Sequence, residues 1–200
     1  GRQMAFTRYS SSEVCSSDLL TKLVSGEMRF AMARTETDVG TNTLQIKTFA
    51  RQDGNKWLIN GNKIWITCVP QAHKMLVVAR TTRYEDAPKR SSGISNFLID
   101  IDREGLTHSP IDKVGTNTNP ASLVYFQDVE AQPDELLGTL DHGWPELLEV
   151  LNTERIVTTA GLVRAGQLAL QFGTNYAKER KVFDDTPTGA HQGFPFPIPP

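Results

Sequence analysis

The stretch that decides the fold of this chain is Trp57-Leu58-Ile59-Asn60-Gly61-Asn62-Lys63-Ile64-Trp65-Ile66-Thr67. Its β-branched and aromatic residues are typical of strands, and they form two short runs on either side of Asn60-Gly61. Because Asn-Gly tolerates the positive φ angles of a tight turn, the stretch predicts an antiparallel hairpin. The alternation of side chains would then place Trp65 and Thr67 on one face of their strand.

Short β-rich segments continue on both sides of this stretch. Residues 43–50 alternate with period two, which predicts a strand with one buried face, and Asp53-Gly54 predicts the turn after it. The other expected strands, with a polar loop at 83–92 between the first two, are 75–80, 96–101, 106–109 and 123–126. Since no helix intervenes, six or so strands predict an antiparallel β-barrel or sandwich domain over residues 20–138.

The pattern changes after Gly138. Between Trp144 and Lys181 the only proline is Pro145, which suits the first turn of a helix, and apolar residues recur with helical spacing. We expect one long helix here, with Asn152 as a candidate break. An amphipathic helix of this length needs a partner, so residues 139–200 are predicted to begin an α-helical bundle that is truncated in this chain. The expected fold class is therefore α+β.

Residues 1–19 differ from the rest. Their serine-rich runs show no apolar period of either kind. The string SSEVCSSDL at 11–19 resembles a translated sequencing adapter, so we expect this segment to be non-native and exclude it from the fold.

Composition narrows the classes of function. The chain has 21 Lys and Arg against 23 Asp and Glu, a net charge of -2, which gives no broad positive field for nucleic acid or an anionic membrane. No run approaches the roughly 20 apolar residues of a membrane span. Cys15 and Cys68 lack the spacing of a disulfide framework or a metal site. We therefore expect a cytoplasmic protein with free thiols and without a metal.

The sequence lacks GxGxxG, GxxxxGK[ST] and HExxH motifs, but it contains an ordered set of four others. They are Thr35-Glu36 with Gly40-Thr41-Asn42, Asn60-Gly61 with Lys63-Ile64-Trp65-Ile66-Thr67, Thr153-Glu154-Arg155, and YAKERKVF at 176–183. The set resembles the acyl-CoA dehydrogenase family, whose usual forms include TEPxxGSD, NGxKxWIT and YAxxRxxFG. The resemblance covers about residues 20–192.

The resemblance implies that FAD lies against the β-domain. Thr35 and Thr67 match threonines that can offer a backbone N–H and a hydroxyl to the polar edge of a flavin. Trp65 matches an aromatic wall for the ring, Gly40 would let the backbone approach it, and Thr41 would stand near both flavin and acyl-CoA. The remaining implied flavin contacts are Met32 and, across a subunit interface, Arg180, Phe183 and Gln192.

The resemblance also implies a reaction, the α,β-dehydrogenation of an acyl-CoA thioester to the trans-2-enoyl-CoA. A carboxylate removes the α-proton while the β-hydrogen leaves as hydride to the flavin. Glu154 is the candidate base, because isovaleryl and long-chain members carry their glutamate directly before the arginine that Arg155 matches. Most members place the base later than this chain extends. Arg155 is also an implied substrate contact.

Plainer alternatives stay open for single positions. Trp65 could be a packed hairpin aromatic, Gly40 a simple turn and Glu154 a solvated acid near a helix start. For the whole chain the alternatives are an acyl-CoA oxidase or flavin monooxygenase of the same fold, or a non-catalytic β-domain fragment. The implied partners are an acyl-CoA substrate, an electron-transfer flavoprotein or similar acceptor, and further copies of the chain in a homodimer or homotetramer.

Four positions depart from the family's usual forms. Thr37 replaces a proline, Asn42 an aspartate and Asp184 a glycine. Arg34 stands directly before Thr35, where the family usually has an apolar residue. The resemblance would thus bring an additional positive charge close to a flavin.

Overall fold

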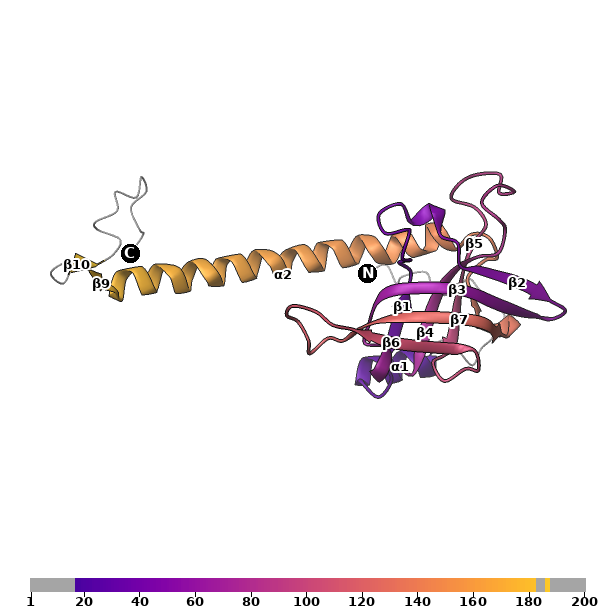
Figure 1. The fold of residues 1–200 in the computed structure, drawn as a ribbon, viewed down its shortest axis with the longest axis horizontal. Helices are drawn as coiled ribbons and strands as arrows, with labels where there is room; N and C mark the ends of the chain where they lie inside the picture. Colours follow the sequence, from indigo (N-terminus) through magenta and orange to yellow (C-terminus); the bar gives the residue numbers. More distant parts are fainter. Residues whose placement is uncertain (1–16, 183–185, 188–200) are drawn as a thin grey trace. The chain divides into compact units, whose positions relative to one another are not determined.

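The computed structural model describes residues 17–182 and 186–187. The chain divides into two compact units, Gly1–Leu147 and Leu148–Pro200, each described by itself below. The described elements (Figure 1) are α1 (Ser17–Ser25), β1 (Phe30–Ala33), η1 (Thr43–Gln45), β2 (Phe49–Asp53), β3 (Lys56–Thr67), η2 (Val69–Gln71), β4 (Lys74–Arg80), β5 (Ile94–Asp100), β6 (Leu106–Ile111), β7 (Ala121–Ala131), η3 (Pro133–Glu135), β8 (Leu136–Leu137), α2 (Gly143–Glu179), β9 (Lys181–Val182) and β10 (Thr186–Pro187).

The first unit is built on one mixed sheet. Its strand order is β6-β7-β3-β2-β4-β5-β8, and β1 joins through β4. Most neighbours are antiparallel, but β1 runs parallel to β4, and β2 meets β4 in parallel at one position. The predicted α+β class, a β-domain followed by a long helix, is confirmed, with β1 making the sheet mixed.

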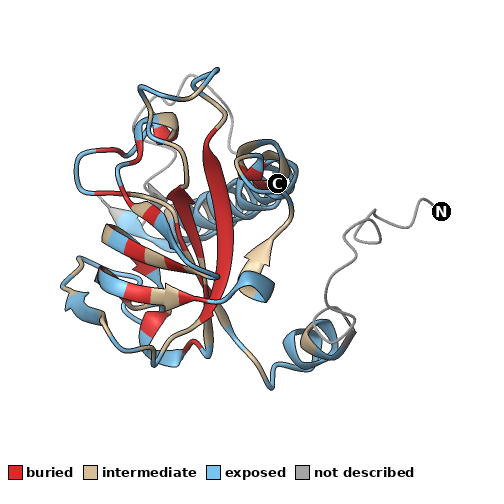
Figure 2. Cartoon of the chain, turned by 90° about the vertical axis from the view of Figure 1, so that its right-hand side faces the viewer, coloured by how far each residue is buried: buried red, intermediate tan, exposed pale blue. Residues whose placement is uncertain are grey.

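The core is formed by buried residues of β1, β3, β4, β5 and β7, and in Figure 2 one strand is buried along its length while other strands are buried only in part. Trp57 and Phe97 pack there with ring centroids 5.8 Å apart. The fully buried aliphatic side chains around them include Ile59, Met75, Val77, Ile99, Val124 and Val129. Burial of each such side chain contributes roughly 1.5–3 kcal/mol. The strands predicted at 75–80, 96–101, 106–109 and 123–126 are confirmed as β4 to β7.

The predicted hairpin at Asn60-Gly61 is wrong, because β3 runs through this dipeptide without turning. The turn lies earlier, after Asp53, as the Asp53-Gly54 pattern predicted. Asn60 instead exchanges hydrogen bonds with Asp128 of β7, donating through Nδ2 at 2.8 Å and accepting the Asp128 N–H at 3.0 Å. Gly61 has φ +146°, and a Cβ there would lie 2.7 Å from the Cα of Thr48. This glycine therefore permits a close approach of two backbones.

The predicted strand over 43–50 is also wrong for most of its length. Residues 43–45 form η1, and β2 begins only at Phe49. Ile46, Thr48 and Ala50 are buried, which explains the alternation in the sequence. Lys47 and Thr48 nevertheless lie outside β2, and their backbone N–H groups donate to a side chain.

Helix α2 is continuous over 37 residues, so the expected break at Asn152 is wrong. The side chain of Asn152 accepts a hydrogen bond from Arg155 Nη1 at 2.8 Å and leaves the backbone ladder intact. Exposed large apolar residues of this helix in the second unit are Val150, Ile156, Val157, Leu162, Val163, Leu168, Leu170, Phe172 and Tyr176. Among the helices of the described ranges, none combines the length and apolarity that a membrane span needs.

Two glycines with positive φ allow a matched test of the close approach at Gly61. Gly54 has φ +62° and a Cβ there would meet no atom within 4 Å, whereas one at Gly61 would meet Thr48. We expect Gly54→Ala to lower the free energy of unfolding by about 1–2 kcal/mol through backbone strain alone. Gly61→Ala should cost about 1–3 kcal/mol more, because the backbone of Thr48 must move. Urea unfolding measures both, and equal losses would contradict the packing of Gly61 on Thr48.

Candidate flavin site

The end of β1 and the bulge of β3 bring Thr35 and Trp65 into one region of the first unit. Ile64 N donates to Thr35 O at 2.9 Å, so Thr35 lies directly beside β3. The register of β3 against β7 shifts between Lys63 and Ile66, and Trp65 within this bulge has φ +62°. The bulge leaves the indole of Trp65 54% exposed. Trp65 and Thr67 are both exposed on either side of buried Ile66, which agrees with their predicted shared face.

The polar groups of these residues are available to a ligand. The hydroxyls of Thr35, Thr41 and Thr67 and the indole N–H of Trp65 make no hydrogen bond within the described part of the chain. A Cβ added at Gly40 would meet no atom within 4 Å, so open space lies beside the backbone there. A flat exposed aromatic ring with hydroxyl groups nearby fits the apolar ring and polar edge of a flavin.

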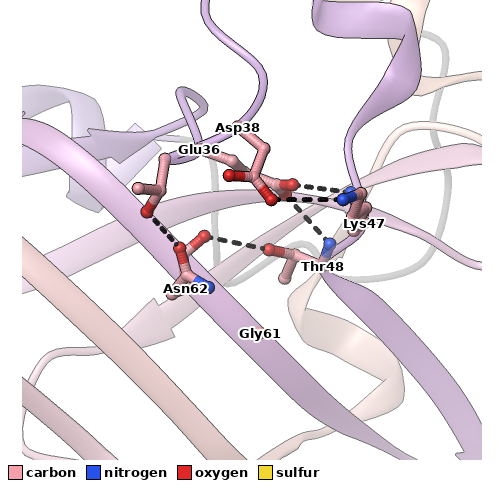
Figure 3. Close-up of a pocket in the computed structure, with 7 residues that line it drawn as sticks. Glu36, Asp38, Lys47, Thr48, Gly61 and Asn62 are labelled. Atoms are coloured by element: carbon pink, nitrogen blue, oxygen red, sulfur yellow. Dashed lines mark hydrogen bonds and ion pairs between the residues drawn. The ribbon is translucent and has the colours of Figure 1, made fainter.

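A buried carboxylate holds this region together. Glu36, which follows Thr35, is 6% exposed, and Lys63 of β3 is completely buried. Oε1 of Glu36 accepts from Lys63 Nζ at 2.9 Å. Figure 3 shows the two other bonds of this carboxylate, in which Oε1 accepts from Thr48 N at 2.9 Å and Oε2 accepts from Lys47 N at 2.6 Å. One side chain thereby joins the segment after β1, the segment before β2, and β3.

Lys63 makes a second contact that completes the attachment. Its Nζ also donates to Arg34 O at 2.9 Å. The ammonium of Lys63 therefore binds the residues on both sides of Thr35, Arg34 through its carbonyl and Glu36 through its carboxylate. The position of Thr35 relative to β3 is set by these two contacts together with the hydrogen bond from Ile64.

Burial and charge act in opposite directions on this pair. Burial lowers the pKa of Lys63 to about 8, the charge of Glu36 opposes this shift, and the charge of Arg34 adds to it. Burial alone would raise the pKa of Glu36, but the charge of Lys63 and the hydrogen bonds from Thr48 and Lys47 bring it below its ordinary value. Both groups are therefore charged at neutral pH.

The loop that follows Glu36 has its own polar contacts. Thr37 Oγ1 donates to Asn62 Oδ1 at 2.8 Å, and exposed Lys47 pairs with exposed Asp38 at 3.2 Å. These residues line a small pocket with Glu36, Thr48 and Gly61 (Figure 3). In the part of the chain that the structure describes, no three His, Cys, Asp or Glu side chains are placed to share a metal ion.

The predicted residues of the second unit lie on α2 or just after it. Glu154 and Arg155 are exposed on the helix. Arg180 follows the helix, where its Nη1 donates to Tyr176 Oη at 2.7 Å and its guanidinium lies 5.6 Å from the centre of that ring. At the helical rise of 1.5 Å per residue, Glu154 and Arg180 are about 39 Å apart along the axis of α2. The two remaining predicted flavin contacts, Phe183 and Gln192, lie outside the described residues.

Sequence reasoning missed the roles of Glu36, Lys63, Lys47 and Thr48. The sequence shows Glu36 and Lys63 only as members of two separate motifs. A usable signal is the spacing of Lys63 from Trp57 and Ile59, because a period-two alternation from these two apolar residues assigns position 63 to the core. A buried lysine requires a carboxylate partner, and the nearby motif supplies one.

Comparison with known proteins identifies this arrangement. The sequence profile described as "Acyl-CoA dehydrogenase, middle domain" matches residues 31–129. Acyl-CoA dehydrogenase FadE12 of Mycobacterium tuberculosis (strain H37Rv) is 36% identical over 179 residues, which are 90% of this chain and 45% of that protein.

Solved structures agree with the profile. The acyl-CoA dehydrogenase from Geobacillus kaustophilus superposes with a TM-score of 0.84 at 29% identity, over 90% of this chain and 47% of that one. A glutaryl-CoA dehydrogenase from Mycobacterium smegmatis, solved in complex with FADH2, gives a TM-score of 0.79 at 29% identity, over 92% of this chain and 45% of that one.

Residues 31–129 thus form an acyl-CoA dehydrogenase middle domain, and the chain belongs to the acyl-CoA dehydrogenase family. It spans a little under half the length of the relatives that it matches.

Replacing Lys63 tests the buried pair. We expect Lys63→Met to lower the free energy of unfolding by about 3–5 kcal/mol, because the carboxylate of Glu36 stays buried without its cation. The double variant Glu36→Gln with Lys63→Met should recover part of this loss, since the neutral amide oxygen can still accept a backbone N–H. Chemical denaturation at pH 7 gives both values.

Lys47→Met is the matched control for Lys63→Met, because Lys47 and Asp38 form a pair in which both side chains are 72% exposed. It should cost less than about 1 kcal/mol. A similar small loss for Lys63→Met, or a double variant no more stable than Lys63→Met, would show that the buried pair does not hold the region.

Proposed function

We propose that this chain carries the flavin-binding domain and the first long helix of an FAD-dependent acyl-CoA dehydrogenase, with the boundary near residues 138–139. The proposed reaction converts an acyl-CoA thioester to the trans-2-enoyl-CoA. The observation that carries the proposal is the exposed indole of Trp65 beside Thr35 and Thr67, whose hydroxyls have no partner among the described residues. Family membership and the FADH2-bound relative support the choice of flavin.

The residues of the first unit would bind and orient the cofactor. FAD, when bound, supplies an acceptor for the β-hydrogen of the substrate as hydride. Trp65 would cover one face of the ring and exclude water from it, while Thr35 and Thr67 would donate hydrogen bonds to its polar edge. Met32 and Gly40 would complete this surface, and Thr41 would contact both flavin and acyl-CoA.

Glu154 is the proposed base in the second unit. Its carboxylate would take the α-proton of the thioester, and Arg155 would contact the substrate beside it. Glu154 is exposed on α2 as described, and a carboxylate base works at neutral pH when it is shielded from water and held near its target. We therefore propose that bound acyl-CoA provides much of this shielding.

Arg180 would bind the pyrophosphate of FAD held by a neighbouring subunit, with Phe183 and Gln192 as further contacts. A guanidinium fork matches phosphate oxygens in a bidentate manner. The separation of about 39 Å between Glu154 and Arg180 supports roles in two different sites, because both lie on or beside one helix. We propose a homodimer or homotetramer on this ground, with an electron-transfer flavoprotein as the electron acceptor.

The proposal is tested in the protein expressed from its complete gene and loaded with FAD. We expect anaerobic addition of acyl-CoA to bleach the flavin absorption, and the enoyl-CoA to form in equal amount. Glu154→Gln should slow this reduction by roughly two or more orders of magnitude with acyl-CoA binding nearly intact, since only the proton acceptor is lost. Trp65→Ala should weaken FAD binding, whereas Trp65→Phe, which keeps a flat ring, should weaken it less.

Three results would contradict the proposal in different ways. Purified protein that takes up no FAD would overturn the flavin site. Normal reduction by Glu154→Gln would assign the base to another residue. Oxygen consumption equal to product formation would show an oxidase in place of a dehydrogenase.

A further inference from the structure

Arg34 is a cation in an unusual place. It follows β1 directly and precedes Thr35. Along this segment Ala31 and Ala33 are buried, while Met32 and Arg34 are only partly buried, so the alternation places Arg34 with Met32 on the side away from the core. Met32 and Thr35 are both proposed flavin contacts, and Arg34 lies between them in the sequence.

The charge of Arg34 is not neutralised by the protein around it. In residues 17–182 and 186–187, no hydrogen bond or ion pair joins its guanidinium to another side chain. The two carboxylates of the adjoining loop are already engaged. Glu36 accepts from Lys63 and two backbone N–H groups, and Asp38 pairs with Lys47.

The buried pair leaves a net positive charge at this position. The guanidinium of Arg34 is close enough to Lys63 to lower the pKa of that ammonium. Two cations, Arg34 and Lys63, thus share one anion, Glu36, and the sum is one positive charge next to Thr35. A partly buried guanidinium without a partner loses solvation that no protein contact restores, which favours a ligand that is negative or becomes negative.

Flavin reduction creates such a charge. Transfer of a hydride adds one unit of negative charge to a neutral ring, and this charge stays there unless a proton follows. A fixed cation beside the ring lowers the free energy of the added charge, more strongly in a partly buried site than in water. Arginine is suited to this role because a guanidinium is a permanent cation.

We propose that Arg34 places a permanent positive charge beside the flavin ring and stabilises the ring after it has accepted the hydride. The inference rests on the proposed flavin site and adds to it a residue that sets the redox potential. It also gives the replacement of an apolar residue by Arg34 a physical role, since an apolar side chain there would leave the added charge without a counter-ion.

The test uses the FAD-loaded protein from the complete gene and two readouts that need no substrate. Sulfite adds to N5 of oxidised flavin and leaves a negative charge on the ring, so its dissociation constant reports the same electrostatic effect as reduction. We expect Arg34→Leu to weaken sulfite binding roughly tenfold or more, and Arg34→Lys, which keeps the charge, to weaken it much less. A tenfold loss corresponds to a midpoint potential lower by about 30 mV for a two-electron couple.

The control outcomes separate this inference from the flavin site itself. If Arg34→Leu retains FAD but keeps the wild-type sulfite affinity and potential, or if Arg34→Lys shifts both as much as Arg34→Leu, the inference is overturned and the flavin site stands. If the wild-type protein takes up no FAD, both are overturned. Arg34→Gln, a neutral variant that keeps a polar side chain, replaces Arg34→Leu if the leucine variant loses its flavin.

Discussion

The buried ion pair between Glu36 and Lys63 is the interaction on which the proposed flavin surface depends. Three segments of the first unit meet at this carboxylate, namely the residues after β1, the residues before β2, and β3. Without it, the ammonium of Lys63 would keep only the carbonyl of Arg34 as an acceptor, and the backbone N–H groups of Lys47 and Thr48 would lose theirs. Each buried polar group that loses its partner lowers the stability of the fold, and the packing of apolar side chains does not offset this loss. The three segments therefore need Glu36 to stay together.

The same pair determines what the surface can do. By binding Arg34 O and Glu36, Lys63 places Thr35 beside β3, next to the bulge that exposes Trp65. The hydroxyl and the indole thus belong to a segment just after β1 and to the bulge of β3, which Lys63 and Ile64 hold together, an arrangement that limits their movement. Because Lys63 binds the buried carboxylate of Glu36, that carboxylate does not neutralise Arg34. The charge of Arg34 is therefore available to a ligand.

The sequence correctly predicted the elements whose conformation depends on residues close together along the chain. The apolar runs of β4, β5 and β7 match their burial, the helical spacing of apolar residues predicted α2, and Asp53-Gly54 has the residues that a tight turn requires. The errors occurred where a distant residue decides the local structure. Asn60 bonds to Asp128, and Gly61 packs on Thr48, so a dipeptide typical of turns lies inside a strand.

The candidate site shows the same division. Thr35, Trp65 and Thr67 were proposed from their motifs, and the structure places Thr35 beside the bulge that carries Trp65. The connection between these motifs could not be predicted from spacing, because it is made by side chains 27 residues apart in sequence. The backbone N–H groups of Lys47 and Thr48 belong to a segment whose alternation predicts a strand. Only the structure shows that their acceptor is the carboxylate of Glu36.

The measurement that tests this account most directly is the dissociation constant of FAD for Lys63→Met, made under conditions in which circular dichroism shows the variant folded. Lys63 has no exposed surface, so any effect on FAD must pass through the position of Thr35 and its neighbours. The account predicts FAD binding weaker by roughly tenfold or more, with Lys47→Met as a control that binds FAD like wild type. Wild-type affinity in folded Lys63→Met would contradict it, because the flavin surface would then be independent of the pair.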